Sequence, residues 1–310
     1  MGNGRQAMDR PEGLSLQLGI RQRGVPRDFR MNVDSLEDEF GDIIQKARTG
    51  LGLTIKQAAD MSGLSVSLLE DMESYRYRPS EREAGTIATV LGLNPGKLYA
   101  IASGMWHPQA CPPELISDVI SISGSIGSYK VNGYILYDSV AREAAVFDTA
   151  NDSRAVLRNL KERGLELRYV FLTHCHSDHI GGLREIVNAT GAEICMPKGE
   201  ASAGIADDMK TNECTVKDGM DFKTGRHNIK AVSTPGHTNG STCYITEDYC
   251  FSGDTLFAGS IGRPYGLDGY STLLKKVREK ILSLNTGIRI FPGHGPTTTI
   301  AEESEHNPFF

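Results

Sequence analysis

The first part of the chain carries apolar side chains at helical spacing. Ile43, Ile44 and Ala47 fall on one face of a helix that begins near Phe40. Further amphipathic stretches follow, each behind a residue that commonly caps a helix: Thr54, Ser65 and Ser80. A short turn over residues 93–99 closes the group. The pattern predicts a bundle of short helices over residues 36–103.

Beyond about residue 115 the pattern changes to short apolar runs separated by amphipathic stretches. The runs typical of strands cover residues 119–122, 131–136, 144–147, 169–172 and 288–291. Helical periodicity returns at about 152–163, 179–189 and 271–283. Strands and helices that alternate in this way predict an α/β domain over residues 116–310.

Two stretches lack a sustained apolar period. Residues 1–35 mix Gly, Arg and Pro, a composition typical of a flexible arm. Residues 104–115 contain prolines and the only tryptophan, Trp106, as expected of a linker. We expect Trp106 to seal the contact between a helical domain and an α/β domain.

The composition limits the cellular context. The 310 residues carry a formal net charge of −6, which gives no overall attraction to nucleic acid or to anionic membranes. The six cysteines form no C-x-x-C pair, and no apolar run approaches the length of a membrane span or a signal segment. We therefore expect a reduced, cytoplasmic protein that does not associate with membranes.

The helical segment resembles the helix-turn-helix domains of phage-repressor and Cro type. The residues that carry the resemblance are Gly52-Leu53-Thr54, Ala58-Ala59, Gly63-Leu64-Ser65, Leu69, Glu73, Pro79-Ser80 and Leu91-Gly92-Leu93. The resemblance implies the fold of these domains and makes DNA a candidate partner for residues 40–100.

Three observations argue against DNA reading by this segment. Ile55 stands where such domains usually carry a Gln that contacts phosphate. The helix expected in the major groove presents Glu70, Asp71 and Glu73 and no basic side chain. Residues 41–100 also hold equal numbers of basic and acidic side chains, which supplies little attraction to phosphates. The alternative is a module for packing or dimerisation, with a homodimer as one outcome.

Histidines and aspartates gather in glycine-rich turns next to the predicted strands. Residues 174–179 form an H-x-H-x-D-H run directly after the strand predicted at 169–172. Three later side chains of the same kind stand beside glycines: His237, Asp254 and His294. The run is too tightly spaced for one helix face, whereas a loop at a strand end lets its members converge. Neutral imidazoles and carboxylates suit zinc, iron(II) or manganese(II), so the pattern predicts one shared metal site.

These motifs resemble the ligand motifs of the metallo-β-lactamase superfamily, over roughly residues 116–310. The resemblance implies an αββα sandwich and two divalent metal ions, zinc in the first place, with iron or manganese as alternatives. It assigns one group of ligands to the first ion: His174, His176 and His237. It assigns a second group to the other ion, with an aspartate between the two: Asp178, His179 and His294, with Asp254 bridging. Asp178 and Asp254 also receive catalytic roles, because the implied nucleophile is a hydroxide that bridges the ions.

Within the superfamily, the second half resembles compact glyoxalase II enzymes, the hydroxyacylglutathione hydrolases. Residues 251–257 are close to the bridging-aspartate motif of that family. The resemblance assigns Arg263 and Tyr265 to binding of the thiol portion of a small thioester substrate. Gly295 stands near the position of a family tyrosine, and the long helical extension of the larger enzymes is missing after His294. The thiol carrier therefore stays open.

Two other readings remain. A persulfide dioxygenase of the same fold would hold one iron with His174, His237 and Asp254, but Pro264-Tyr265 replaces the acidic-aromatic pair typical of that family. A sensor or transcriptional regulator would use the helix-turn-helix on DNA and the metal domain to detect a ligand. The motifs favour a metal-dependent thioester hydrolase over both.

Overall fold

Five short helices, each with an identifiable start signal, open the described part of the chain. The computed structural model describes residues 35–200 and 213–310, so the predicted flexible arm lies outside the described residues except for residue 35. The helices are α1 (Phe40–Gly50), α2 (Ile55–Ser62), α3 (Val66–Glu73), α4 (Glu81–Leu91) and α5 (Pro95–Ser103). The side chains of Thr54, Ser65 and Ser80 accept hydrogen bonds from the first turns of α2, α3 and α4. The predicted helical bundle and its caps are confirmed.

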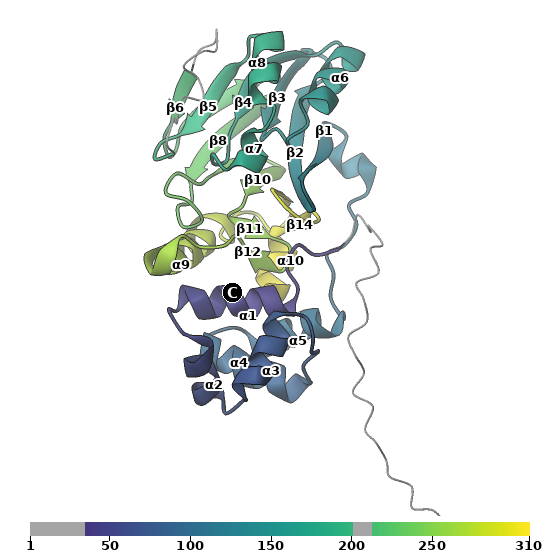
Figure 1. The fold of residues 1–310 in the computed structure, drawn as a ribbon. Helices are drawn as coiled ribbons and strands as arrows, with labels where there is room; N and C mark the ends of the chain where they lie inside the picture. Colours follow the sequence, from purple (N-terminus) through teal and green to yellow (C-terminus); the bar gives the residue numbers. More distant parts are fainter. Residues whose placement is uncertain (1–34, 201–212) are drawn as a thin grey trace, which may run out of the picture. The chain divides into compact units, whose positions relative to one another are not determined.

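Beyond residue 115, the described residues build two six-stranded sheets (Figure 1). The first sheet has the order β1-β2-β3-β4-β5-β6, with the following bounds: β1 Val119–Ile126, β2 Tyr129–Asp138, β3 Glu143–Phe147, β4 Glu166–Phe171, β5 Glu193–Pro197 and β6 Glu213–Val216. Strands β1, β2 and β3 pair antiparallel, and β3 to β6 pair parallel. A short 3-10 turn, η1 (Pro113–Ile116), precedes β1.

The second sheet has the order β14-β13-β10-β9-β8-β7. Its strands have the following bounds: β7 Asp221–Thr224, β8 His227–Ser233, β9 Thr242–Ile245, β10 Tyr249–Gly253, β13 Arg289–Pro292 and β14 Thr298–Thr299. All its pairs are antiparallel except β10 with β13. A small ribbon of β11 (Leu256–Phe257) and β12 (Ser260–Ile261) follows β10.

Aromatic side chains fill the space between the sheets, and aliphatic side chains fill the space under the helices. Phe147 of the first sheet stacks on Phe251 of the second with ring centroids 3.8 Å apart. Helices α6 (Ser153–Arg163) and α8 (Leu183–Thr190) cover the other face of the first sheet through a separate apolar cluster. Helices α9 (Gly266–Lys276) and α10 (Ile300–His306), with the π-turn η2 (Val277–Ile281), pack on the second sheet. The expected αββα sandwich is confirmed.

The prediction of one continuous helix over residues 179–189 is wrong. The structure has a short α7 (Ser177–Ile180) and then α8, separated by Gly181 and Gly182. Gly182 has a φ of +82°, and a Cβ on Gly181 would lie 2.0 Å from Asn151 Oδ1. The break is required because the chain here passes too close to Asn151 for a regular helix with side chains. The helix predicted at 271–283 begins earlier, at Gly266, and ends in η2.

The helical bundle and the second sheet share one apolar core. Side chains of α1, α4 and α5 belong to the same cluster as Cys250, Ile290 and Leu273. Trp106 is buried, its ring stacks on His306 at 5.2 Å between centroids, and a Cβ on Gly259 would lie 2.7 Å from that ring. Trp106 therefore lies where the sequence places it, at the contact between the helices and the α/β part. The domain boundaries at 36–103, 104–115 and 116–310 stay predictions. Among the described residues, no helix has the length and apolar character needed to span a bilayer.

Candidate metal centre

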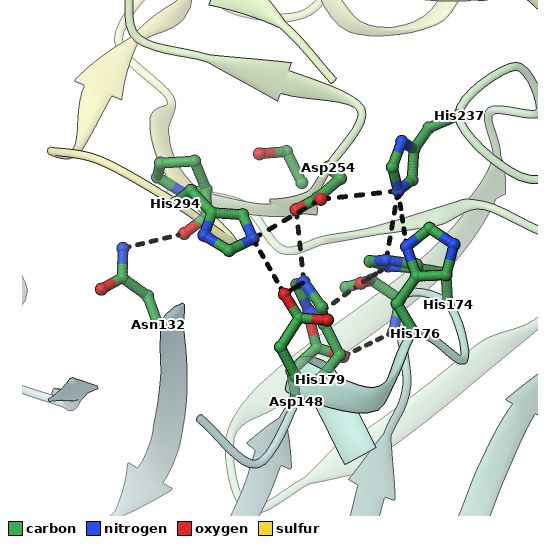
Figure 2. A network of polar contacts seen from close by, with 12 residues as sticks. Asn132, Asp148, His174, His176, His179, His237, Asp254 and His294 are labelled. Carbon is green, nitrogen blue, oxygen red and sulfur yellow. Dashed lines mark hydrogen bonds and ion pairs between the residues drawn. The ribbon is translucent and has the colours of Figure 1, made fainter. Parts of the chain in front are cut away.

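The predicted ligands come together from the ends of four strands (Figure 2). The run of residues 174–179 follows β4 of the first sheet and continues into α7. The other three predicted ligands follow strands of the second sheet: His237 after β8, Asp254 after β10 and His294 after β13. Residues far apart in the sequence thus meet at one edge of the sandwich. The structure gathers all seven residues named from the sequence.

Three imidazoles form the first group. The Nε2 atom of His237 lies 3.3 Å from Nε2 of His174 and 3.1 Å from Nδ1 of His176. One ligand atom from each lies within 4.8 Å of the others. Such a set of nitrogens, all directed at one point, is the arrangement of a metal-binding triad.

The second group contains Asp178, His179 and His294, whose ligand atoms also lie within 4.8 Å of one another. The carboxylate of Asp254 lies between the two groups: its Oδ1 is 3.4 Å from His179 Nε2, and its Oδ2 is 3.4 Å from His237 Nε2. Oδ2 is also 3.6 Å from His294 Nε2. A carboxylate placed in this way can contact two cations at once, which is the bridging role predicted for Asp254.

The outer nitrogens of four histidines are all held by oxygen atoms. Nδ1 of His237 lies 2.7 Å from the carbonyl oxygen of Arg263, and Nδ1 of His294 lies 2.5 Å from that of Lys130. Nδ1 of His179 lies 2.8 Å from Asp148 Oδ2, and Nδ1 of His174 lies 3.0 Å from Thr173 Oγ1. Because carbonyl and carboxylate oxygens only accept, each ring they hold carries its proton on Nδ1 and directs the Nε2 lone pair inward.

This arrangement fits a pair of divalent cations. Inward lone pairs repel one another unless a cation or added protons lie between them. His179 Nε2 and Asp254 Oδ1 are buried and find no hydrogen-bond partner among the described residues, although they face each other. Buried polar atoms normally have partners, so these two are the atoms expected to bind metal.

The electrostatics show the same demand for positive charge. Burial alone would raise the pKa of Asp254, but the imidazoles of His179, His294 and His174 hold it well below its usual value. Burial lowers the pKa of His179, yet the carboxylates of Asp254 and Asp148 outweigh it and raise that pKa well above its usual value. Protons on the imidazoles can thus neutralise the negative charge of these carboxylates. A bound metal cation would take over that role and displace the protons.

Two carboxylates that support the site were not singled out from the sequence as functional. Asp148 accepts hydrogen bonds from Thr173 N and Thr173 Oγ1 as well as contacting His179. Glu200 accepts from Cys175 N at 2.9 Å and Gly240 N at 2.9 Å, and so ties the first motif to the loop after His237. The available signal was the position of Asp148 at the end of β3, the same position in a strand that marks the ligands.

The loop of the last histidine motif is held by the amide of Asn132 and depends on a glycine at position 293. Asn132 on β2 donates its amide to the carbonyl oxygens of Pro292 and Gly295, on both sides of His294. Gly293 lies so close to the site that a Cβ there would be 2.4 Å from Asp254 Oδ1 and 2.6 Å from His179 Cε1. The loop can therefore pass beside the ligands only with glycine at this position.

The two predicted substrate residues lie on the loop that holds His237 through the Arg263 carbonyl oxygen, and both are exposed. Arg263 is exposed, and its Nη2 lies 3.4 Å from Gln45 Oε1 of helix α1. Tyr265 is 74% exposed and its backbone N donates to the carbonyl oxygen of Gly236. Tyr265 also lines a cavity of about 370 Å³ together with Gly236 and Asn239. Their role in substrate binding stays a prediction.

One cysteine and three histidines match no ligand position. Burial raises the pKa of the Cys175 thiol to about 12, so the thiol is protonated at neutral pH. His227 contacts Asp118 Oδ2 at 3.1 Å, and His306 stacks on Trp106. His107 is exposed. None of these three histidines belongs to the groups of ligand atoms found among the described residues.

The chain belongs to the metallo-beta-lactamase superfamily, whose family model matches residues 129–294. A second family model, of helix-turn-helix domains, matches residues 44–98. Membership in the superfamily makes this chain a metal-dependent hydrolase that uses divalent ions.

The similar proteins include several hydrolases. The chain is 30% identical to the probable metallo-hydrolase YqgX of Bacillus subtilis over 59% of this chain and 94% of that protein. It is 29% identical to the hydroxyacylglutathione hydrolase GloC of Haemophilus influenzae over 59% and 94%. Among solved structures, BLEG-1 B3 metallo-beta-lactamase is 31% identical with a TM-score of 0.53, over 61% of this chain and 99% of that one. ETHE1 from Myxococcus xanthus is 28% identical with a TM-score of 0.54, over 61% and 83%.

Proposed function

We propose that the protein hydrolyses a small acyl thioester, in the manner of glyoxalase II. The likeness to GloC supports this substrate class, because hydroxyacylglutathione hydrolase is the activity in that protein's name. The cation and phenol beside the ligand cluster support it as well, since they suit the carboxylate of a small thiol carrier.

The observation that carries the proposal is the 2.7 Å contact between His237 Nδ1 and the Arg263 carbonyl oxygen. One short loop thereby orients a metal ligand with its backbone and presents the Arg263 guanidinium to solvent beside the site. A substrate bound by Arg263 would have its acyl group near the ligands of the first group.

The residues divide into ligands and positioning groups. His174, His176 and His237 would hold one ion, and Asp178, His179 and His294 the other, with Asp254 shared. When bound, the ions supply an activated water at neutral pH and positive charge for the developing oxyanion. Asp178 lies 3.4 Å from His294 Nε2 at the open side of the cluster, where it can orient that water. Zinc suits this donor set, and iron or manganese are alternatives.

A substrate screen tests the proposal. Purified protein would be loaded with zinc, iron or manganese and offered a lactoyl thioester, a glutathione persulfide, a lactam and a phosphodiester. We expect thiol release from the thioester with no oxygen uptake. Oxygen uptake with the persulfide, by a preparation holding one iron, would establish the dioxygenase alternative instead. Preferential lactam opening would place the chain with the β-lactamases.

For the helical domain we propose packing on the hydrolase rather than reading of DNA. The acidic groups of α3 bind arginines within the domain: Glu73 holds Arg48 at 2.6 Å, and Asp71 holds Arg76 at 2.8 Å. Helix α3 therefore offers phosphates the exposed Glu70 and no basic side chain, and the shared apolar core ties the domain to the second sheet. Dimerisation through this domain remains a prediction.

A further inference from the structure

Helix α1 lies directly beside the segments that frame the metal centre. Its Lys46 is buried, pairs with Asp38, and donates from Nζ to the carbonyl oxygen of Ile261 at 2.7 Å. Lys46 Nζ also lies 5.1 Å from the centre of the Phe257 ring, and this ring makes an edge contact with the His294 ring at 5.8 Å between centroids. One buried lysine therefore connects α1 to the ribbon that follows Asp254.

The end of α1 and the turn before it make equally close contacts. A Cβ on Gly50 would lie 2.4 Å from the ring of Tyr270 in α9, so helix and ring meet without space for a side chain. Before α1, Glu37 lies against Gly295, where an added Cβ would be 3.0 Å from Glu37 Cβ. The helical domain thus reaches the loop that carries the last ligand.

Between these contacts, Gln45 meets the loop of Arg263. Gln45 Oε1 lies 3.4 Å from Arg263 Nη2, and Gln45 Nε2 lies 3.5 Å from Glu73 Oε2. Glu73 is in turn held by two bonds from Arg48, at 2.6 and 2.7 Å. Gln45 is half-buried. The Arg48–Glu73 ion pair holds its amide nitrogen, so its amide oxygen is directed at the exposed Arg263.

We propose that the helical domain forms one wall of the substrate site, and that Gln45 is a positioning residue that holds Arg263 for the carboxylate of the thiol carrier. The inference rests on the proposed thioesterase function. A guanidinium offers five N–H donors, so the bond to Gln45 leaves two parallel N–H groups free to bind both oxygens of a carboxylate. A neutral carrier would gain nothing from this arrangement.

The test compares two substrates and two variants. The lactoyl thioester of glutathione carries carboxylates, whereas that of N-acetylcysteamine carries none. In Gln45→Met the side chain keeps a similar size but loses the acceptor, and Thr49→Ala serves as the control on an exposed position of the same helix. Metal content and melting temperature are measured for each protein to show that the fold is kept.

We expect Gln45→Met to raise KM roughly 3- to 10-fold for the glutathione thioester, with kcat and the KM of the neutral thioester unchanged. Arg263→Ala should act in the same way, and the double variant should add little further. If wild type and Gln45→Met have equal KM values for the glutathione thioester, or if KM rises equally for both thioesters, the inference is overturned and the proposed function is not affected. A wild type that cleaves neither thioester would overturn the proposed function and this inference with it.

Discussion

Asp148 Oδ2 lies 2.8 Å from His179 Nδ1, and this contact decides which nitrogen of a buried ring faces the metal centre. The same carboxylate accepts hydrogen bonds from Thr173 N and Oγ1, so its position is fixed from two sides. Thr173 in turn contacts the Nδ1 of His174. One aspartate outside the ligand set therefore orients a ligand from each group.

Replacing Asp148 should weaken metal binding while all the ligands stay in place. Asp148→Asn keeps the shape but can present an amide N–H to the ring, which favours the wrong tautomer. We expect affinity for zinc to fall about 10- to 100-fold. Competition with a chromophoric chelator measures the change, and the exposed Asp221→Asn is the matched control. Wild-type affinity in Asp148→Asn would show that the contact is not needed.

Gly293 should tolerate no side chain. A methyl group in Gly293→Ala would meet Asp254 Oδ1 at 2.4 Å and His179 Cε1 at 2.6 Å, inside the cluster of ligands. We expect loss of bound metal and of hydrolysis. At Gly287 the nearest atom to an added Cβ is Asn285 Oδ1 at 3.4 Å, so Gly287→Ala should keep both properties. Metal analysis of the two purified variants distinguishes the effects; equal metal content would contradict the geometry.

The buried Glu303 should make stability depend on pH. Burial raises the pKa of this carboxyl from near 4.5 to about 7. Between these two pH values the folded state keeps a proton that the unfolded state has lost. The contribution of Glu303 to the free energy of unfolding is therefore full below about pH 4.5 and disappears as the pH rises through 7. The size of the effect is about 3 kcal/mol.

Urea unfolding between pH 5 and 8 tests this point. The free energy of unfolding of wild type should fall with rising pH relative to Glu303→Gln, which mimics the protonated form. The exposed Glu305→Gln should follow the wild type. A wild-type curve parallel to that of Glu303→Gln would mean that the carboxyl titrates alike in both states.

The helical domain should bind duplex DNA only weakly. Because α3 presents carboxylates and its domain has no net positive charge, few counterions can be released from DNA. In a salt titration monitored by fluorescence anisotropy, we expect no binding at 150 mM salt and micromolar protein. Saturable binding under those conditions, with a steep salt dependence, would favour the regulator alternative.

Much of this architecture could be predicted from the sequence, because the signals are local. The caps Thr54, Ser65 and Ser80 mark helix starts by residue type alone, and the H-x-H-x-D-H run carries its ligands in one loop. His237, Asp254 and His294 could be predicted because each follows a strand and stands beside glycine. The division of these residues into two groups came from the family resemblance, whereas the distances between their atoms depend on the packing of two sheets, which only the structure provides.

The missed features depend on contacts between distant segments. The break between α7 and α8 exists because Gly181 passes close to Asn151, and nothing in the local periodicity reports that contact. Asp148 resembles any aspartate after a strand until His179 is placed beside it. Gln45 is an ordinary polar position of a helix, and its contact with Arg263 spans 218 residues of sequence.

The measurement that bears most directly on the account is the metal content of purified protein, by mass spectrometry, for wild type, Asp254→Ala and Asp221→Ala. Asp254 touches both groups of ligands, so its loss should affect both ions. We expect about two equivalents of divalent metal in wild type and in Asp221→Ala, with most of it lost from Asp254→Ala. A wild type that retains no transition metal, or an Asp254→Ala that retains the full amount, would contradict the account.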